Sequence, residues 1–240
     1  MFPSLVPALS RLPALLLLTG LAAAAAHAQS SCSSDGQPAP ATLLERFINA
    51  DCANCWTDVR TARPTGRELA LDWVLPGSLG DNAPLSAVAT RDGVQRLEAL
   101  EAMPPAATLH RKAPVQSRQG TLRVAHGLPV SGYIGASIQL RRPPVGATSL
   151  PWTAWLALVE TLPSGTEGSP VARNLVRNTI QPIWDKGQQL SKGEQVHFRE
   201  SRVMDIPPGA NPERLAVIGW VQDSEGRILA AAQSRCIKPR

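Results

Sequence analysis

The chain has 240 residues, of which 43% are hydrophobic and 18% are charged, and its formal net charge is +5. This length is sufficient for one large domain or two small ones, each around a buried core. The arginines that give the chain its charge are scattered, and no basic stripe with interleaved aromatic residues occurs. The composition therefore argues against a nucleic-acid-binding protein.

Residues 1–28 have the features of a secretory signal peptide. Arg11 precedes an apolar segment over residues 12–26, and residues 26–28 (Ala-His-Ala) form a small-residue cleavage site. The apolar segment is shorter than the ~20 residues of a membrane-spanning helix, so we predict cleavage rather than an uncleaved anchor. Abundant Ala, Pro, Arg and Gly are typical of GC-rich bacterial genomes. We therefore expect a periplasmic or secreted protein without a stable membrane span.

The first part of the mature chain alternates predicted strands and helices. Apolar residues on both faces predict a strand that is buried in a mixed sheet, and Pro and Gly end the short helix that follows it. The predicted elements are an irregular lead-in over 29–41, a strand over 42–49, a short helix that ends before Pro64 and Gly66, a strand over 67–77 and a helix over 82–103.

The second part is rich in strand patterns. Short apolar runs alternate with Gly, Pro and Ser, and residues 223–226 (DSEG) predict a turn that joins the last two runs into a hairpin. About seven strands with such turns are typical of an antiparallel sandwich. The predicted strands cover residues 121–126, 133–141, 153–161, 171–183, 194–203, 214–223 and 227–235.

All four cysteines follow the predicted signal peptide, and an even number in an exported protein favours disulfides. Four cysteines allow three pairings. Cys52 and Cys55 are close enough to pair within one helical turn, and we therefore predict that Cys32 joins Cys236. Closing a loop of about 200 residues stabilises a folded chain by about 5 kcal/mol in the chain-entropy model.

Cys52 and Cys55 form a C-x-x-C pair between a predicted strand and a predicted helix. At a helix N-terminus the pKa of a thiol falls, and the thiolate becomes reactive. Cys52 would attack a disulfide and Cys55 would resolve the mixed disulfide, with Trp56 packed beside them. One hypothesis is therefore a thiol–disulfide oxidoreductase that acts on exported proteins or redox partners. The other is a non-enzymatic binding or envelope-structure protein in which both pairs are structural disulfides.

Other roles for the pair are disfavoured. A closed zinc site needs four ligands, and His110, His126 and His197 are each isolated in the sequence. Haem attachment needs a histidine directly after the second cysteine, where this chain has Trp56. We therefore predict no metal and no cofactor.

The segment TLLERFINADCANCW (residues 42–56) resembles the start of a secreted proteobacterial family catalogued as domain of unknown function 1223. Similarity extends over most of residues 42–233, through ELALDWVLPGSLGDNAPL, GSPVARNLVRNTIQPI and LAVIGWVQDSEGRILAAAQ. The resemblance implies a thioredoxin-like domain with the C-x-x-C after its first strand, followed by a β-rich segment. The family usually has Pro after the second cysteine, where this chain has Trp56.

From the elements and the resemblance together we predict a reduced thioredoxin-like α/β domain over residues 42–120, followed by an antiparallel β-sandwich domain over residues 121–240. Thioredoxin-like folds place a cis-proline against the cysteine pair. Pro114 in KAPVQ is the candidate for that position.

Several other polar and aromatic residues have both a functional and a structural interpretation. In one interpretation, Asp51 and Asp72 form an acidic pair near the thiols. In the favoured interpretation, Asp51 caps a helix and Asp72 is a carboxylate in a loop or on an edge strand. We expect Trp152 and Trp155 in the sandwich core rather than in a stacking site. We expect Arg173 and Arg177 on a solvated face rather than in an anion site. We expect His126 and His197 at the surface, or in the core with their hydrogen bonds satisfied, rather than as ligands.

Overall fold

The structure is a computed structural model that describes residues 32–117, 122–141, 150–185 and 198–236. The predicted signal peptide and His197 lie outside the described residues. Strands dominate the fold, and in the described ranges α-helix is limited to α1 (Ala53–Trp56) and α2 (Arg91–Ala99). None of the helices in these ranges combines the length and the apolar character needed to cross a membrane.

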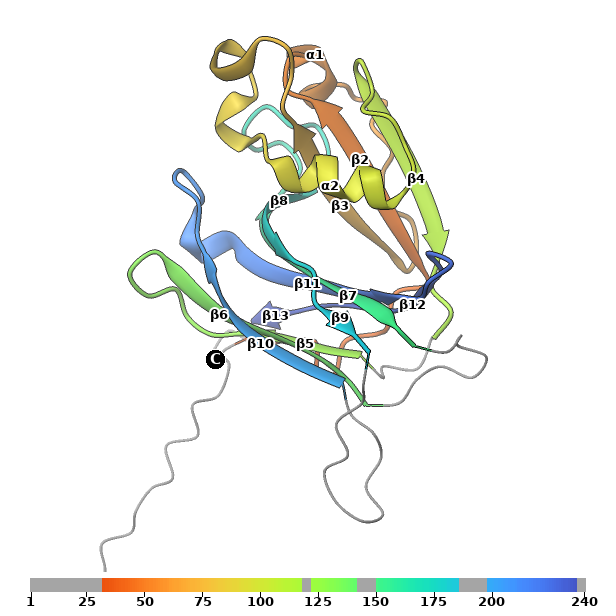
Figure 1. Cartoon of the computed structure of the whole chain (residues 1–240). Coiled ribbons are helices and arrows are strands. Elements are labelled where there is room, and N and C mark those ends of the chain that lie inside the picture. Colours follow the sequence, from red (N-terminus) through yellow and green to blue (C-terminus); the bar gives the residue numbers. More distant parts are fainter. Residues whose placement is uncertain (1–31, 118–121, 142–149, 186–197, 237–240) are drawn as a thin grey trace, which may run out of the picture.

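The strands form two sheets (Figure 1). The smaller sheet has the order β10 (Phe198–Asp205), β6 (Tyr133–Leu140), β5 (Leu122–His126), β1 (Cys32–Ser33) and β13 (Arg235–Cys236). The larger sheet has the order β12 (Ile228–Gln233), β11 (Leu215–Gln222), β7 (Trp152–Leu162), β8 (Arg173–Ile180), β3 (Glu68–Leu75), β2 (Thr42–Asn49) and β4 (Thr108–Pro114), with β9 (Ile183–Trp184) beside β7. Short 3-10 turns cover Gly80–Asn82, Ser86–Val88 and Pro212–Arg214.

The smaller sheet packs on one face of β7, β11 and β12, and this contact forms the first hydrophobic core. Successive side chains of a strand point to opposite faces, so Leu156 and Leu158 of β7 enter this core. Trp155, Ala157 and Val159, which alternate with them along the strand, enter the second core on the other face. The near-continuous apolar runs of β7 and β11 follow from this burial on both faces.

The larger sheet curls around the second core until its two edge strands meet. The chain that leaves β4 runs beside β12, where the Gln116 and Ser117 amides donate to the Ile228 and Leu229 carbonyls at 2.9 Å. Inside the curl, the rings of Trp155 and Trp220 stack at a centroid distance of 5.4 Å. The curled sheet therefore buries a core of its own, separate from the sandwich core.

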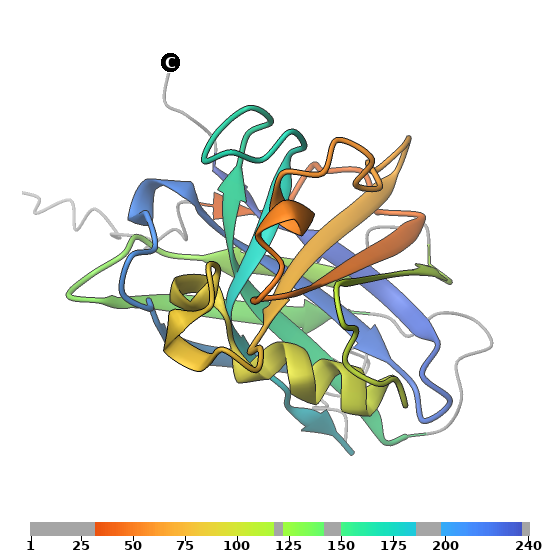
Figure 2. The ribbon, with the colours of Figure 1, turned by 90° about the horizontal axis from the view of Figure 1, so that it is seen from above.

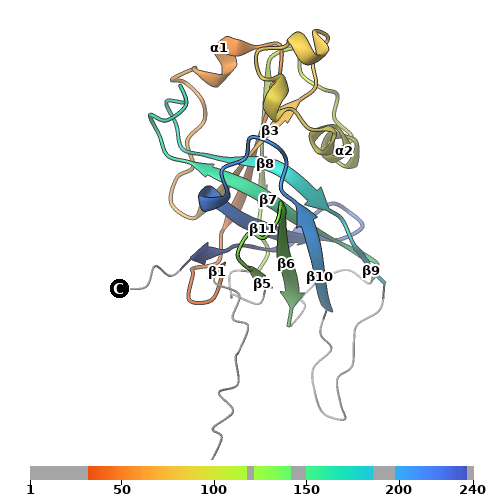
Figure 3. The ribbon, with the colours of Figure 1, turned by 90° about the vertical axis from the view of Figure 1, so that its left-hand side faces the viewer.

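The two helices cover opposite faces of β2 and β3 (Figures 2 and 3). Leu97 of α2 belongs to the second core, and Trp56 of α1 belongs to a third, smaller cluster. Arg96 fixes α2 to the sheet, because its fully buried guanidinium donates two hydrogen bonds, of 2.7 and 2.8 Å, to the Glu45 carboxylate. The same guanidinium lies 5.0 Å from the centroid of the Trp155 ring.

The predicted thioredoxin-like fold is wrong, because the chain is mostly β and its described part contains no thioredoxin-like α/β core. β2 and β3 do pair in parallel, but α1 has only four residues. Strands from both sides of residue 120 share the larger sheet. β4 was not predicted, because an edge strand leaves most of its side chains exposed and lacks a strand pattern.

Most individual elements were predicted correctly. The strand over 42–49 is β2, the helix after the cysteines is short, and the hairpin of β11 and β12 turns at residues 223–226. The predicted helix over 82–103 contains the 3-10 turn Ser86–Val88 and α2, and the 3-10 turn Gly80–Asn82 precedes them. Local periodicity thus located the strands but did not determine how they pair.

We expect Gly219→Ala to lower the free energy of unfolding by about 1–3 kcal/mol through overpacking of the sandwich core. A Cβ atom at Gly219 of β11 would lie 2.6 Å from Val124 Cγ1 and 2.8 Å from Ile138 Cδ1 of the opposing sheet. Gly135→Ala is the matched control, because no atom lies within 4 Å of the added Cβ. Urea unfolding of the two variants measures the effect. Equal stabilities would contradict the described contact between the sheets.

Candidate functional site

The Cys52–Cys55 pair lies at the surface, directly after β2. The two residues form a disulfide with a Cα–Cα distance of 5.3 Å, and both are half-buried. Cys52 is the N-cap residue of α1, but α1 is a single turn of four residues. Since a helix macrodipole is the sum of aligned peptide dipoles, one turn supplies little of the field that would stabilise a thiolate.

Trp56 anchors α1 to the interior. Its indole Nε1 donates to the Glu167 carbonyl at 2.8 Å, and the Arg173 guanidinium lies 4.4 Å from the centroid of its ring. Arg173 also donates to the Trp56 carbonyl at 2.8 Å. Trp56 belongs to the cluster on which the partly buried Cys55 packs. The predicted position beside the cysteines is therefore correct, and the contacts that Trp56 makes are structural.

Asp51 does not cap α1, contrary to the sequence-based expectation. Its carboxylate turns to the loop after β3, where it accepts hydrogen bonds from the Ser78 amide at 2.7 Å and the Ser78 hydroxyl at 2.8 Å. The Leu79 amide donates to the other oxygen at 3.2 Å. These bonds, led by that of the Ser78 side chain, lower the pKa of Asp51. The carboxylate therefore organises a loop.

The structure separates Pro114 from the cysteine pair. Pro114 pairs with Thr42 at the start of β2, whereas Ile48, at the end of β2 that leads to Cys52, pairs with Thr108. The cis peptide bond that the described residues contain is Leu150–Pro151. The expectation of a cis-proline at position 114 beside the cysteines is thus wrong, since it depended on the thioredoxin-like fold.

A buried charge cluster lies below α1. The Asp72 carboxylate of β3 pairs with Arg46 at 2.6 Å and with Arg173 at 2.7 Å, and all three side chains are fully buried. The Asp72 carboxylate also accepts a hydrogen bond from the backbone N–H of Asn174 at 3.1 Å. Arg46 and Arg173 each occupy one of the two carboxylate oxygens, so Asp72 is not free to relay protons to the cysteines. Asp51 and Asp72 therefore do not act as a pair.

The other candidates from the sequence also have structural positions. Trp152 is buried in the sandwich core, as expected, whereas Trp155 is buried in the second core inside the curled sheet. Arg173 and Arg177 are buried, so the expectation of a solvated face is wrong. Arg177 lies 3.9 Å from Glu160 and donates to the Pro208 carbonyl at 2.9 Å. The acidic partners of Arg173 and Arg177 are distant in the sequence, so the periodicity of the strand does not predict these ion pairs.

We expect Asp72→Asn to lower the free energy of unfolding by about 3–5 kcal/mol, because two buried arginines lose their counter-charge. Asp58→Asn is the control. It removes the carboxylate of an exposed ion pair with Arg60, 3.1 Å long, and should leave the free energy of unfolding nearly unchanged. Chemical denaturation of both variants at neutral pH tests this. A tolerated Asp72→Asn would show that the cluster does not hold the fold together.

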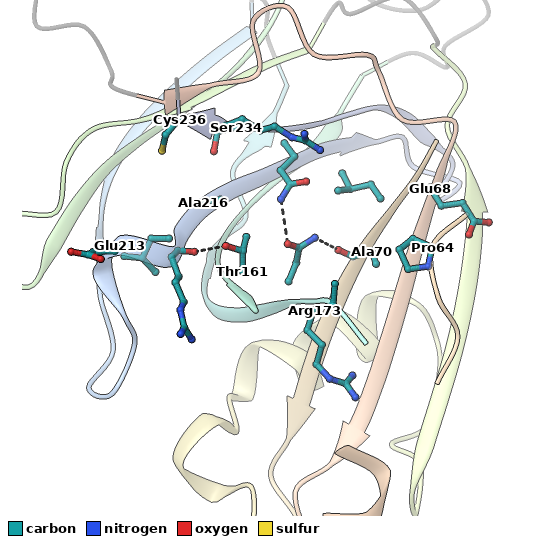
Figure 4. Close-up of a pocket in the computed structure, with 16 residues that line it drawn as sticks. Pro64, Glu68, Ala70, Thr161, Arg173, Glu213, Ala216, Ser234 and Cys236 are labelled. Carbon is teal, nitrogen blue, oxygen red and sulfur yellow. Dashed lines mark hydrogen bonds between the residues drawn. The ribbon is translucent and has the colours of Figure 1, made fainter. Parts of the chain in front are cut away.

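A hollow with a volume of about 470 Å³ opens where the larger sheet and β13 approach each other (Figure 4). One wall comes from Glu68, Leu69 and Ala70 of β3, and the other comes from β11, Gln233 of β12 and Arg235 and Cys236 of β13. Figure 4 shows Ser234 and Cys236 across the hollow from Ala70 and Pro64. A cavity of this size is in the range of small-molecule sites.

Two amide side chains are fixed inside the hollow. Asn174 of β8 donates to the Ala70 carbonyl at 2.8 Å and accepts from the Gln233 amide at 3.3 Å. Arg235 is exposed on the wall formed by β13. The Arg173 side chain points away from Ser234 and Cys236, toward the buried cluster (Figure 4). No sequence motif indicates this site, because its residues come from five separate segments of the chain.

Comparisons with known proteins show a related fold. No family model and no curated protein matches the chain. Among solved structures, HBP35 of Porphyromonas gingivalis is 11% identical, with a TM-score of 0.51 over 84% of this chain and 76% of that chain. Chicken MD-1 complexed with lipid IVa is 10% identical, with a TM-score of 0.22 over 50% of this chain and 92% of that chain. The similarity to HBP35 concerns the fold alone.

Proposed function

We propose that this protein is an exported, non-catalytic binding protein of the periplasm. The hollow between β3 and β13 is its binding site, and Cys32–Cys236 and Cys52–Cys55 are structural disulfides. The observation that carries the proposal is the hollow itself, a volume of about 470 Å³ with fixed amide groups inside it. The two disulfides are compatible with an exported chain.

The surroundings of Cys52 and Cys55 support a structural role for that pair. A catalytic cysteine needs a group that stabilises its thiolate, such as a helix N-terminus, a nearby cation or a histidine. Here the helix is a single turn, Asp51 is bonded to the next loop, and the Arg173 guanidinium is committed to Asp72. None of these three features is therefore positioned to activate Cys52.

The residues around the hollow favour a small polar ligand. Asn174 and Gln233 offer amide groups, which both donate and accept hydrogen bonds. Exposed Arg235 offers a guanidinium, which binds carboxylate or phosphate through paired N–H groups. Leu69 and Ala216 add a small apolar area. A ligand with an acidic group and an adjacent amide or hydroxyl, such as an amino acid, a dipeptide or a sugar acid, matches this set.

A thermal-shift panel of amino acids, dipeptides, dicarboxylates and sugar acids tests the proposal. We expect at least one of these compounds to raise the melting temperature of the wild-type protein. Ala216→Phe, which fills the hollow, should abolish that shift, and Ala53→Phe on exposed α1 should retain it. Gln233→Ala should weaken binding about 3- to 10-fold through the loss of one hydrogen bond, and exposed Gln116→Ala should not.

Two results would count against the binding site. One is a panel without any shift in the wild-type protein. The other is a shift that Ala216→Phe retains in full while the variant remains folded by circular dichroism, since such binding would have to occur elsewhere.

A thiol–disulfide exchange function at Cys52–Cys55 is the second candidate. The observation that favours it is the half-buried position of both cysteines at the surface, because exchange requires a sulfur that a partner can reach. Exported proteins with disulfides would be the partners. This candidate does not require a thioredoxin-like fold.

Paired serine variants separate the two candidates. In the chain-entropy model, Cys32→Ser with Cys236→Ser should lower the free energy of unfolding by about 5 kcal/mol, and Cys52→Ser with Cys55→Ser by about 2 kcal/mol. A structural Cys52–Cys55 bond should also have a reduction potential below about −300 mV. A higher potential, together with catalysed reduction of insulin by dithiothreitol that the Cys52/Cys55 variant loses, would favour exchange.

A further inference from the structure

Three residues with metal-binding side chains lie side by side on adjacent strands. Cys32 of β1 is the direct partner of Cys236 on β13 and, on its other side, of His126 on β5. The two sulfurs and a ring nitrogen of His126 all lie within 4.8 Å of one another. Sequence spacing could not reveal this group, because the three residues belong to three distant segments that only the sheet register aligns.

The His126 ring is oriented as a metal ligand. Its Nδ1 lies 2.9 Å from the Gly127 carbonyl, and a carbonyl only accepts, so Nδ1 carries the hydrogen and Nε2 carries the lone pair. Nε2 is buried and has no hydrogen-bond partner among the described residues, and the residue is only 4% exposed. Metal-bound histidines usually donate their second ring N–H to a carbonyl or carboxylate in this way.

We propose that reduction of the Cys32–Cys236 disulfide uncovers a binding site for one thiophilic metal ion, Cu(I) or Zn(II), with Cys32, Cys236 and His126 as ligands. Thiolate sulfur and imidazole nitrogen are the donors that both ions prefer. Two thiolates and one imidazole satisfy a three-coordinate Cu(I). Zn(II) takes a water as its fourth ligand, for which exposed Cys236 leaves room.

A dithiol is the reductant in the proposed reduction of the Cys32–Cys236 disulfide, and its atoms and electrons balance as follows. The dithiol gives two electrons and two protons to the Cys32–Cys236 bond and becomes a disulfide, while Cys32 and Cys236 become thiols. Metal binding then releases those two protons, because each cysteine binds as a thiolate. Neutral His126 binds without releasing a proton.

The position of the Cys32–Cys236 disulfide makes its reduction by a dithiol possible. Cys32 is buried, but Cys236 is exposed and lines the hollow between β3 and β13. A reductant can therefore reach the sulfur of Cys236. The metal ion would then replace the disulfide as the link between β1 and β13. The inference is independent of the small polar ligand proposed above, since it uses neither Asn174 nor Gln233.

Metal titration of the reduced protein tests the site. The full chain with Cys52→Ser and Cys55→Ser leaves Cys32 and Cys236 as its cysteines. It is reduced with a phosphine under argon, freed of the phosphine, and titrated with Co(II) as a spectroscopic probe, then with Zn(II) and Cu(I) in competition. We expect one equivalent to bind, a thiolate-to-cobalt charge-transfer band, and a rise in melting temperature with Zn(II) or Cu(I).

Histidine variants in the same background show whether His126 is a ligand. His126→Gln should weaken binding at least about 10-fold, whereas His110→Gln on the exposed strand β4 should bind as the parent does. Equal binding by the oxidised protein, equal binding by folded His126→Gln, or the absence of a charge-transfer band would each overturn the proposal. If His126→Gln does not fold, the proposal is tested instead by the rate at which Cys32 and Cys236 are alkylated in the reduced Cys52→Ser/Cys55→Ser protein. Bound Zn(II) or Cu(I) should slow the modification of Cys32 and Cys236, and unchanged rates would overturn the site.

Discussion

The Asp72 carboxylate holds together parts of the chain that the backbone alone joins weakly. β3 and β8 share a single bridge pair, Asp72 with Leu175, although this junction connects the two halves of the larger sheet. Arg46 from β2 and Arg173 from β8 meet on Asp72 and also donate to the Ala62, Ala172 and Trp56 carbonyls. Burying three charges is costly unless each is paired, so the arrangement defines one register for β3 and β8. It also fixes the end of α1, the loop after α1 and the segment before β8.

The neighbouring residue of β2 repeats this principle on the opposite face. Glu45 and Arg46 are adjacent, so the alternation of a strand sends them to opposite faces of the sheet. Glu45 binds Arg96 of α2, which also donates to Gln222 of β11 at 2.8 Å. One strand thus holds α2 on one face and the loops around α1 on the other. A charged pair within an apolar strand, Leu-Glu-Arg-Phe, is consistent with burial only because both charges find partners.

The sequence predicted most of the longer strands and the two disulfides but not strand β4 or the assembly of the sheets. Apolar alternation depends on neighbouring residues, and it located β2, β7 and β11 because each is long and buried. The order of strands depends on contacts between distant residues, such as Asp72 with Arg173, and no local pattern encodes them. The motif around Cys52 and Cys55 favoured a redox domain because it lies between a predicted strand and a predicted helix. The groups that activate a thiolate, however, are supplied by the tertiary structure.

The candidate sites occur where the sheets end rather than where the motif lies. Ser234, Arg235 and Cys236 leave β12 and cross to the smaller sheet, and in doing so they form one wall of the hollow. Cys32 binds that wall through the disulfide. The bond that joins the two ends of the folded chain therefore also sets the position of Arg235 at the mouth of the hollow. Stability and the shape of the hollow depend on the same covalent link, so a change in its redox state is expected to change both together.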